Sequence, residues 1–400
     1  MFTLNPYQQA MLDGNDGKAS QKAMQILLAL AKIYNAEKLL PVSSVQIAGV
    51  SYDNMGEAGL EYLTEIADNG GRVKVFTTLN PAGMDRENWQ ALGIPPDFAR
   101  QQIRVLDAFA RMGVVTTCTC TPYLVGNLPV FGEHIAWSES SAVCYANAVL
   151  GARTNREGGP SALAAALTGF TPAYGMHLDE NRKPTLAVQV ETDIHGTHAF
   201  GSLGVSISRK ISHMALKPVV WIEGIHSASL EELKSFCASL ATYAGSAIFH
   251  IPGITPESNC YSKPLESISI SEDELKEAHQ DLNTLNDVPV DFVSLGCPHL
   301  SLPEIEHITR LLAGKKVKKE FWITTSRPVK QMADQMGYTK IIEESGARFA
   351  TDTCCVVAPI KGRFHRMATD SAKACYYAFG KNQMDTVFLP FDEVIQEALR

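Results

Sequence analysis

Three cysteines of this chain occupy the same kind of place, the irregular turn just after a predicted strand. Cys120 follows the run MGVVTT, Cys297 follows DFVSLG, and Cys354 follows RFATD. Thiolates at such turns are stabilised by nearby backbone N–H groups and helix N-termini. Three thiolates that converge from strand ends could hold an iron–sulfur cluster with one iron left open, or a metal ion with three protein ligands.

The remaining cysteines are weighed against these three. Cys144 and Cys237 lie within apolar helical patterns and are expected in the core, and Cys355 leads into the apolar run VVAPI. Cys118 stands two residues before Cys120, and strand alternation would put both side chains on one face, so either could be the ligand. None of the spacings is a C-x-x-C motif, so spacing alone does not identify the bound group.

The residues that follow Cys120 are crowded with polar and charged groups, above all in GEHIAWSESSAVCYANAVLGARTNREGGP (residues 132–160). The Glu and His of this stretch lack the H-E-x-x-H spacing of a zinc protease, and a hydrogen-bonded structural His134 is an equally good interpretation. The part GARTNREGGP is either a polar turn after a helix or a carboxylate- or phosphate-binding loop, since arginine forms bidentate hydrogen bonds with both anions. TTLNPAGMD follows a strand and is either a simple turn or a substrate loop. IAGVSY is another strand-end turn, in which Gly49 and Ser51 could let the backbone approach a ligand.

The elements that must position these groups alternate between strands and helices. Helical periodicity is clear over residues 21–34 and 57–67, and short β-branched runs lie between such segments. Further along, VVWIEGI precedes a helix that begins with Ser229 and Glu232, and VDFVSLG precedes one that begins with Ser301 and Glu304; both pairs are capping boxes. We therefore predict an α/β fold of parallel βα units, with ligands at the carboxyl ends of the strands.

Length and charge limit the class of protein further. Four hundred residues with 45% hydrophobic content suffice for more than one core. We expect two α/β lobes within residues 1–400, with an irregular boundary or mobile loop near residues 255–289. A net charge of −8 argues against nucleic acid or an anionic membrane as partner, and it still allows a small anionic substrate in a locally basic pocket.

The sequence also predicts the cellular compartment. The first residues lack the basic and apolar regions of a signal peptide, and no apolar run is long enough to cross a membrane. Nine cysteines without an export signal favour a reducing compartment, where cysteines are more often core residues, metal ligands or catalytic groups than disulfides. We expect a cytoplasmic protein.

Taken together, four motifs resemble the aconitase X family, specifically its large, catalytic-domain subunit. They are CTCTPYL, the run from GEHIAWSESSAV to LGARTNREGGPSAL, GCPH with the helix after it, and TDTC with VVAP. The resemblance extends over essentially the whole chain and includes QIAGVSY, TTLNPAGMD and YGMHLDENR. It implies an aconitase-like, multi-lobed architecture without the small swivelling domain, because the chain ends at Arg400 soon after FDEVIQEALR.

The resemblance also implies an activity and a cofactor. Members of the family are hydro-lyases with an iron centre held by three cysteines, and the motifs match these ligands to Cys120, Cys297 and Cys354. The group is expected to be a 4Fe–4S cluster, with mononuclear iron or 2Fe–2S as alternatives. CTCTPY and LNPAGMD are more similar to the archaeal enzymes that convert (R)-5-phosphomevalonate to trans-anhydromevalonate 5-phosphate in a modified mevalonate pathway. A cis-3-hydroxy-L-proline dehydratase is the alternative.

The resemblance also suggests which groups take part in the reaction. The acting base of the superfamily is a serine on the swivelling domain, so a separate small subunit that carries this domain and serine is implied. In this chain we predict His134, Glu139 and His177 as orienting or acid groups. The predicted substrate-binding residues, all in strand-end turns or the polar stretch, are Gly49, Ser51, Asn80, Asp85, Ser138, Ser140, Asn147, Arg153, Asn155, Arg156, Gly158 and Gly159. A mononuclear metal hydrolase with Cys120, His134 and Cys297 and a non-catalytic scaffold are remoter alternatives.

Overall fold

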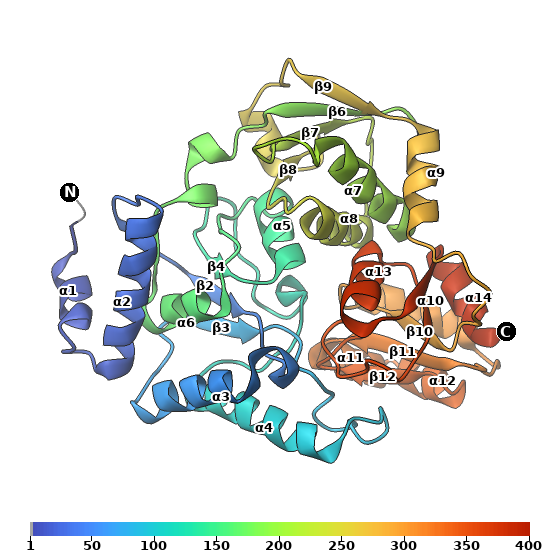
Figure 1. The fold of residues 1–400 in the computed structure, drawn as a ribbon, viewed down its shortest axis with the longest axis horizontal. Coiled ribbons are helices and arrows are strands. Elements are labelled where there is room, and N and C mark those ends of the chain that lie inside the picture. Colours follow the sequence, from blue (N-terminus) through green and yellow to red (C-terminus); the bar gives the residue numbers. More distant parts are fainter. Residues whose placement is uncertain (1–2) are drawn as a thin grey trace.

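A computed structural model describes residues 3–400 and contains three parallel β-sheets that follow one another along the chain (Figure 1). The predicted α/β fold of parallel βα units is therefore confirmed. The sequence predicted two lobes, whereas the structure has three. The second sheet was hard to separate from the third because its edge strand β9 (Ser267–Ile270) is partly polar and resembled loop, and β8 (Phe249–His250) has only two residues.

The first lobe holds the sheet β3-β2-β4, whose strands β2 (Ser44–Ile47), β3 (Phe76–Leu79) and β4 (Ala136–Trp137) are parallel. The strands β1 (Leu39–Pro41) and β5 (Phe170–Pro172) pair antiparallel beside it. The helices of this lobe are α1 (Pro6–Leu12), α2 (Lys18–Ile33), α3 (Tyr52–Asp68), α4 (Pro96–Arg111), α5 (Ser140–Ala148) and α6 (Gly159–Thr168). Short 3₁₀ turns are η1 (Pro122–Leu124), η2 (Gly175–His177) and η3 (Asp179–Asn181).

The second lobe holds the sheet β8-β7-β6-β9, with β6 (Leu186–Val190) and β7 (Val220–Glu223) at its centre. Its helices are α7 (Thr197–Ile211), α8 (Leu230–Tyr243) and α9 (Glu272–Asp281), with the 3₁₀ turn η4 (Pro256–Cys260). The helix α5 of the first lobe packs on α8, so its buried side chains join the core of the second lobe (Figure 1). The predicted boundary segment 255–289 thus includes β9 and α9, and the passage to the third lobe is residues 282–291.

The third lobe holds the sheet β12-β11-β10-β13-β14, all of whose neighbouring strands are parallel. The strands are β10 (Phe292–Leu295), β11 (Glu320–Thr325), β12 (Arg348–Thr351), β13 (Arg366–Thr369) and β14 (Asp385–Phe388). The helices are α10 (Leu302–Leu312), α11 (Arg327–Gln335), α12 (Tyr338–Glu344), α13 (Ala372–Tyr377), the π-helical η5 (Ala378–Asn382) and α14 (Phe391–Leu399). This lobe lies on the right of Figure 1, beside both others.

Local sequence signals explain where many of these elements begin. The predicted capping boxes at Ser229 and Ser301 are confirmed at the starts of α8 and α10, and each satisfies backbone N–H groups that a helix start leaves free. The predicted helices over 21–34 and 57–67 correspond to α2 and α3. Gly56 has φ +60° inside α3, so its first turn is set apart from the rest.

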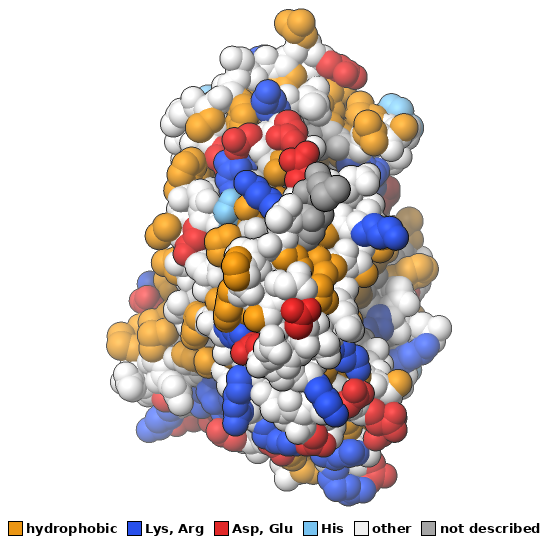
Figure 2. Space-filling model, turned by 90° about the vertical axis from the view of Figure 1, so that its left-hand side faces the viewer, with side chains coloured by type: hydrophobic (Ala, Val, Ile, Leu, Met, Phe, Trp, Pro, Cys, Tyr) orange, Lys and Arg blue, Asp and Glu red, His pale blue; other side chains and the backbone are white. Residues whose placement is uncertain are grey.

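The surface follows the mixed charge pattern of the sequence. On the face that carries α1 and α2, basic and acidic side chains are interspersed, and hydrophobic side chains gather near the middle (Figure 2). Exposed apolar residues of these two helices include Tyr7, Ile33 and Tyr34. Among residues 3–400, no helix is long and apolar enough to cross a membrane.

A buried ion pair joins the first two lobes at their connection. Arg182 is fully buried, and its Nε and Nη2 atoms donate to the Glu257 carboxylate at 2.6–3.0 Å. Its remaining N–H groups donate to Asn147 and to the carbonyl oxygens of Ala152 and Met176. The guanidinium thus ties the connector to both lobes.

We expect Arg182→Met to lower the free energy of unfolding by about 3–5 kcal/mol, because it leaves the Glu257 carboxylate buried without a cation. The double variant Arg182→Met/Glu257→Gln should recover a large part of this loss, since it removes both charges. Chemical unfolding of the two variants and the unaltered chain measures the difference. Equal losses for the single and double variants would contradict a charge-based effect.

Candidate active site

The three cysteines predicted as ligands come together between the first and third lobes. Cys120 follows Val115, which forms an isolated parallel β-bridge with Thr78 of β3. Cys297 and Cys354 follow β10 and β12. All three therefore lie at carboxyl ends of parallel strands, where ligands of α/β proteins bind. The two sheet edges meet directly: the backbone N–H of His299 donates to Cys120 Sγ at 3.2 Å.

The three thiols influence one another's ionisation, so they are treated as one group. Burial raises the pKa of Cys120 well above its usual value, and Glu139, Cys354 and Cys297 raise it further. Burial and then Cys354 raise the pKa of Cys297 to about 12. Burial also raises the pKa of Cys354. When no metal group is bound, these sulfurs stay protonated, and a metal group that binds them must displace their protons.

The structure separates Cys118 from Cys120. The prediction that strand alternation puts both side chains on one face is wrong, because residues 116–119 form no strand and Cys118 has φ +46°. The Cys118 side chain is fully buried in the core of the first lobe. Its charge interacts with Asp352, Arg86 and Arg327 rather than with the other two strand-end thiols. Cys120 is therefore the better candidate ligand.

A buried ion pair of opposite charges lies beside the thiols. The Lys373 ammonium contacts the Glu139 carboxylate, and it donates to the hydroxyls of Ser140 and Ser141 at 3.3 Å. Burial opposes both charges, yet Lys373 keeps the pKa of Glu139 below its usual value, and Glu139 and then Cys297 raise that of Lys373. Glu139 also caps α5 through the N–H of Ala142. The pair stays charged and links the first lobe to the third.

Sequence reasoning missed Lys373, although a signal was available. The β10–β13 register pairs Phe292 with Met367, and continued to the sheet edge it brings Cys297 level with Ala372. MATDSAK therefore has the same pattern as the cysteine turns, a strand followed by a capped helix start. Applying the strand-end rule to every strand, and not only to those followed by cysteine, would have found this residue.

Several buried polar atoms without partners lie in strand-end turns of the two sheets that carry the thiols. In residues 3–400, the buried atoms with no hydrogen-bond partner include Asn80 Oδ1, Ser138 Oγ and Thr353 Oγ1. Asn80 and Ser138 directly follow β3 and β4, and Thr353 precedes Cys354. A buried polar atom that lacks a partner is costly, so such atoms gathered at one edge indicate a place for a polar ligand.

Four more of the predicted residues lie at the same edge of the first sheet. Gly49 and Ser51 follow β2, and Ser51 Oγ donates to Val357 O at 3.0 Å, across to the third lobe. Gly158 and Gly159 begin α6, and a Cβ on Gly159 would approach Ala48 O to 3.0 Å. Together with Asn80, Ser138, Glu139 and Ser140, they make up the predicted residues that this edge brings together.

Arg156 is the exposed cation of this region. Its side chain has no hydrogen bond or ion pair within the described part of the chain, and it lies three residues before Gly159, where α6 begins. The helix N-terminus there offers backbone N–H groups and a partial positive charge. Arg156 therefore stays a predicted anion-binding residue, with a helix start beside it.

His134, His177 and Arg153 form a separate cluster. The bridge between His134 and Arg153 lies before β4 begins, whereas Ser138 follows its end. Four residues of extended chain span about 13 Å, so this cluster lies at the opposite end of β4 from Ser138. The two ring Nδ1 atoms are 3.0 Å apart, and Arg153 pairs with Asp179 at 2.5 Å. Their predicted catalytic and substrate roles stay untested predictions, without support from this placement.

Three other predicted residues are occupied by structural contacts. The Asn155 amide bonds the backbone of Tyr174 and Met176. Asn147 bonds Thr154, Ala247 and Arg182. The Asp85 carboxylate accepts from four donors and ties its loop to the third lobe; the donors are the backbone N–H groups of Glu87, Asn88 and Thr351 and the Arg327 guanidinium.

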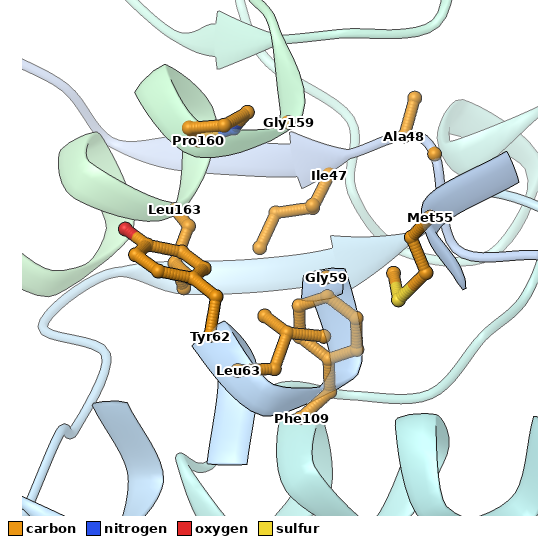
Figure 3. A pocket seen from close by; sticks show the side chains of 11 residues that line it. Ile47, Ala48, Met55, Gly59, Tyr62, Leu63, Phe109, Gly159, Pro160 and Leu163 are labelled. Carbon is orange, nitrogen blue, oxygen red and sulfur yellow. The ribbon is translucent and has the colours of Figure 1, made fainter. Parts of the chain in front are cut away.

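An apolar cavity of about 210 Å³ lies at the same side of the first lobe. Figure 3 shows side chains of α3, α6 and β2 around it, with the Tyr62 hydroxyl and the Met55 sulfur as the polar or polarisable atoms of its labelled side chains. Ile47, Leu63 and Leu163 supply much of the remaining wall. The cavity lacks charged groups, so it does not provide the chemistry of the thiol site.

The ligand set of the mononuclear hydrolase is not assembled. His134 lies before β4, whereas Ser138 and Glu139 follow its end, which is the end near the three thiols. In residues 3–400, no group of three or more His, Cys, Asp and Glu side chains is spaced for a single metal ion. The nine cysteines are all free.

The chain belongs to the aconitase X family. The family's first, second and third domains match residues 1–180, 184–280 and 290–400. The chain is 44% identical to the phosphomevalonate dehydratase large subunit of Methanocaldococcus jannaschii over 98% of this chain and 99% of that protein. It is 35% identical to the cis-3-hydroxy-L-proline dehydratase of Hypocrea jecorina, over 93% of this chain and 64% of that protein.

A solved structure supports the same assignment. The crystal structure of Thermococcus kodakaraensis aconitase X in its holo-form is 41% identical to the chain, with a TM-score of 0.91 over 99% of this chain and 100% of that one. The aconitase-like, multi-lobed fold predicted from the sequence is thereby confirmed.

The His134–His177 pair should make stability depend on pH. Burial, with help from His134, Arg182 and Arg153, lowers the pKa of His177 to about 3. An unfolded histidine takes up its proton near pH 6.5, so below that pH the unfolded chain binds more protons. The free energy of unfolding therefore falls as pH drops from 6.5 toward 3, by up to about 1.4 kcal/mol per pH unit from this residue.

We expect His177→Asn to flatten this decline, because asparagine keeps a hydrogen-bonding atom near the Nδ1 position and does not titrate. Urea unfolding between pH 7.5 and 4.5 measures the slope, and the exposed His226→Asn serves as control. An unchanged slope in the His177 variant would contradict the assignment.

Proposed function

We propose that this chain is the large subunit of a phosphomevalonate dehydratase, a hydro-lyase that removes water from (R)-5-phosphomevalonate and forms trans-anhydromevalonate 5-phosphate in a mevalonate pathway of isoprenoid synthesis. The observation that carries the proposal is the match to such a large subunit over nearly the whole length of both proteins. The buried group of three thiols supports the reaction type. The hydroxyproline dehydratase is a more distant relative, and this chain covers about two thirds of it.

An iron–sulfur cluster, in our proposal of the 4Fe–4S kind, is the cofactor that fits these residues. Cys120, Cys297 and Cys354 would hold it, since Cys120 and Cys354 are buried, Cys297 is partly buried near them, and the Lys373 ammonium lies close by. When bound, such a cluster supplies a Lewis acid with an open position, which assists the departure of a hydroxyl group. A 2Fe–2S cluster is the alternative; mononuclear iron is disfavoured, because in residues 3–400 no three His, Cys, Asp or Glu side chains are spaced for a single metal ion.

The other groups of the site would bind and orient the substrate. Arg156 and the backbone N–H groups at the start of α6 suit an anionic group such as phosphate or carboxylate. Ser138 Oγ and Asn80 Oδ1, which lack partners within residues 3–400, suit the hydroxyl groups of the substrate. Glu139 holds Lys373 in place, so that a fixed positive charge stays beside the thiols and the charge that develops on the substrate.

The base that removes the Cα proton would come from a small subunit. The name of the relative as a large subunit supports a partner, and we propose that this partner carries the swivelling domain with the catalytic serine. A cytoplasmic complex fits the nine free cysteines.

We expect the complex with the small subunit, reconstituted without oxygen, to dehydrate mevalonate 5-phosphate and to leave cis-3-hydroxy-L-proline unchanged. The chain alone should be inactive, because it would lack the base. Product analysis with both substrates, with and without the partner, checks this. Turnover of hydroxyproline alone, or full activity without a partner, would overturn the proposal.

Cys120 and Cys118 form a matched pair for the cofactor. Both are buried, so replacing either sulfur by a hydroxyl has a similar packing cost. We expect Cys120→Ser to lose bound iron and sulfide at least tenfold and Cys118→Ser to keep both. Iron and sulfide analysis after anaerobic reconstitution measures this. Zinc without sulfide in the unaltered complex would sink the cluster assignment.

A further inference from the structure

The imidazole of His299 contacts all the cysteine-bearing turns. Its Nδ1 atom lies 3.0 Å from the Thr119 hydroxyl, and its Nε2 atom lies 2.9 Å from the Thr353 carbonyl oxygen. Its own backbone N–H donates to Cys120 Sγ. Thr119 directly precedes Cys120, Thr353 directly precedes Cys354, and His299 itself is two residues after Cys297.

The hydrogen bonds define the tautomer of this ring. The Thr353 carbonyl accepts only, so Nε2 carries the hydrogen and Nδ1 accepts from the Thr119 hydroxyl. The Thr119 oxygen in turn accepts from the backbone N–H of Thr121 at 3.2 Å. The ring is fully buried. Both nitrogens are thus occupied by fixed partners.

We propose that His299 is the positioning residue of the thiol group: its ring holds the turns of Cys120, Cys297 and Cys354 in one register. The inference rests on the proposed function, because it concerns the same site. The three turns come from distant parts of the chain and from two lobes. A ligand set that shifts by about 1 Å commonly loses its function, so two directed bonds to residues adjacent to ligands are an effective constraint.

Ordinary packing does not require this arrangement, as a second buried histidine shows. His250 is also fully buried, and its Nε2 lies 2.8 Å from the carbonyl oxygen of Arg182 in the second lobe. Its Nδ1 atom has no partner within the described residues. His250 therefore has the same size, burial and one comparable bond, but it contacts no cysteine-bearing turn. It is the matched control.

Graded variants separate the two bonds. Asparagine places its amide near the Nδ1 position and glutamine near the Nε2 position. His299→Asn should keep the bond to Thr119, and His299→Gln should keep the bond to Thr353, whereas His299→Ala loses both. We expect bound iron and sulfide after anaerobic reconstitution to fall at least tenfold in the alanine variant and less in the other two. The time for EDTA to bleach the cluster absorbance should shorten in the same order.

His250→Ala should lower the melting temperature of the iron-free chain about as much as His299→Ala, and should keep iron, sulfide and bleaching time unchanged. A His299→Ala chain that loads iron and sulfide fully, with a normal bleaching time, would overturn the inference.

A readout without iron distinguishes this inference from the proposed function. Dibromobimane links two thiols that lie close together, and peptide mapping identifies the link between Cys120 and Cys297 in the iron-free chain. We expect His299→Ala to reduce the yield of this link at least fivefold, and His250→Ala to leave it unchanged. If the unaltered chain forms the link but takes up no iron and sulfide, the proposed cofactor fails while the positioning role stands. An equal yield in His299→Ala would overturn the positioning role.

Discussion

The rest of this structure depends on one constraint, the meeting of three thiols in a space from which water is largely excluded. Each of Cys120, Cys297 and Cys354 has its pKa raised by burial, so the chain alone disfavours the charged form that binds a metal group. Two features partly offset this cost. A fixed cation, Lys373, favours the charged forms of Cys297 and Cys354, and the backbone N–H of His299 favours that of Cys120.

The same constraint explains why the lobes are joined by buried charges. The thiols come from separate lobes, so the distance between the sheet edges must be fixed. Lys373 with Glu139 links the first lobe to the third, and Asp352 does so a second time by accepting from Arg86 and Arg327. Buried pairs contribute little net stability when compared with apolar side chains, but a wrong arrangement leaves a charge unpaired. They therefore fix one geometry more strongly than an apolar contact would.

The sequence predicted many of the strands and helices and the placement of three cysteines at strand ends, because both follow from local rules. Strand-to-helix turns are recognisable in one dimension, and the carboxyl ends of parallel strands meet in space. The polar stretch could not be resolved in this way, because it runs along β4 and along the parallel segment 153–157, so its residues are divided between opposite ends of the sheet. Ser138 and Glu139 thus reach the thiol side, and His134 and Arg153 do not. The prediction that Cys118 and Cys120 share one face failed for a different reason. Cys118 has a positive φ, which the alternation of side chains along a strand does not predict.

The contacts of the site bear on where the base of a dehydration can come from. A base that abstracts a Cα proton must be free to accept it and must reach the substrate. At the thiol edge, Glu139 holds Lys373, and His299 uses both ring nitrogens, so neither is free to accept this proton. His134 and His177 lie at the other end of β4 and bond each other. These side chains are therefore suited to binding and orientation, which fits our proposal that the base comes from a partner subunit.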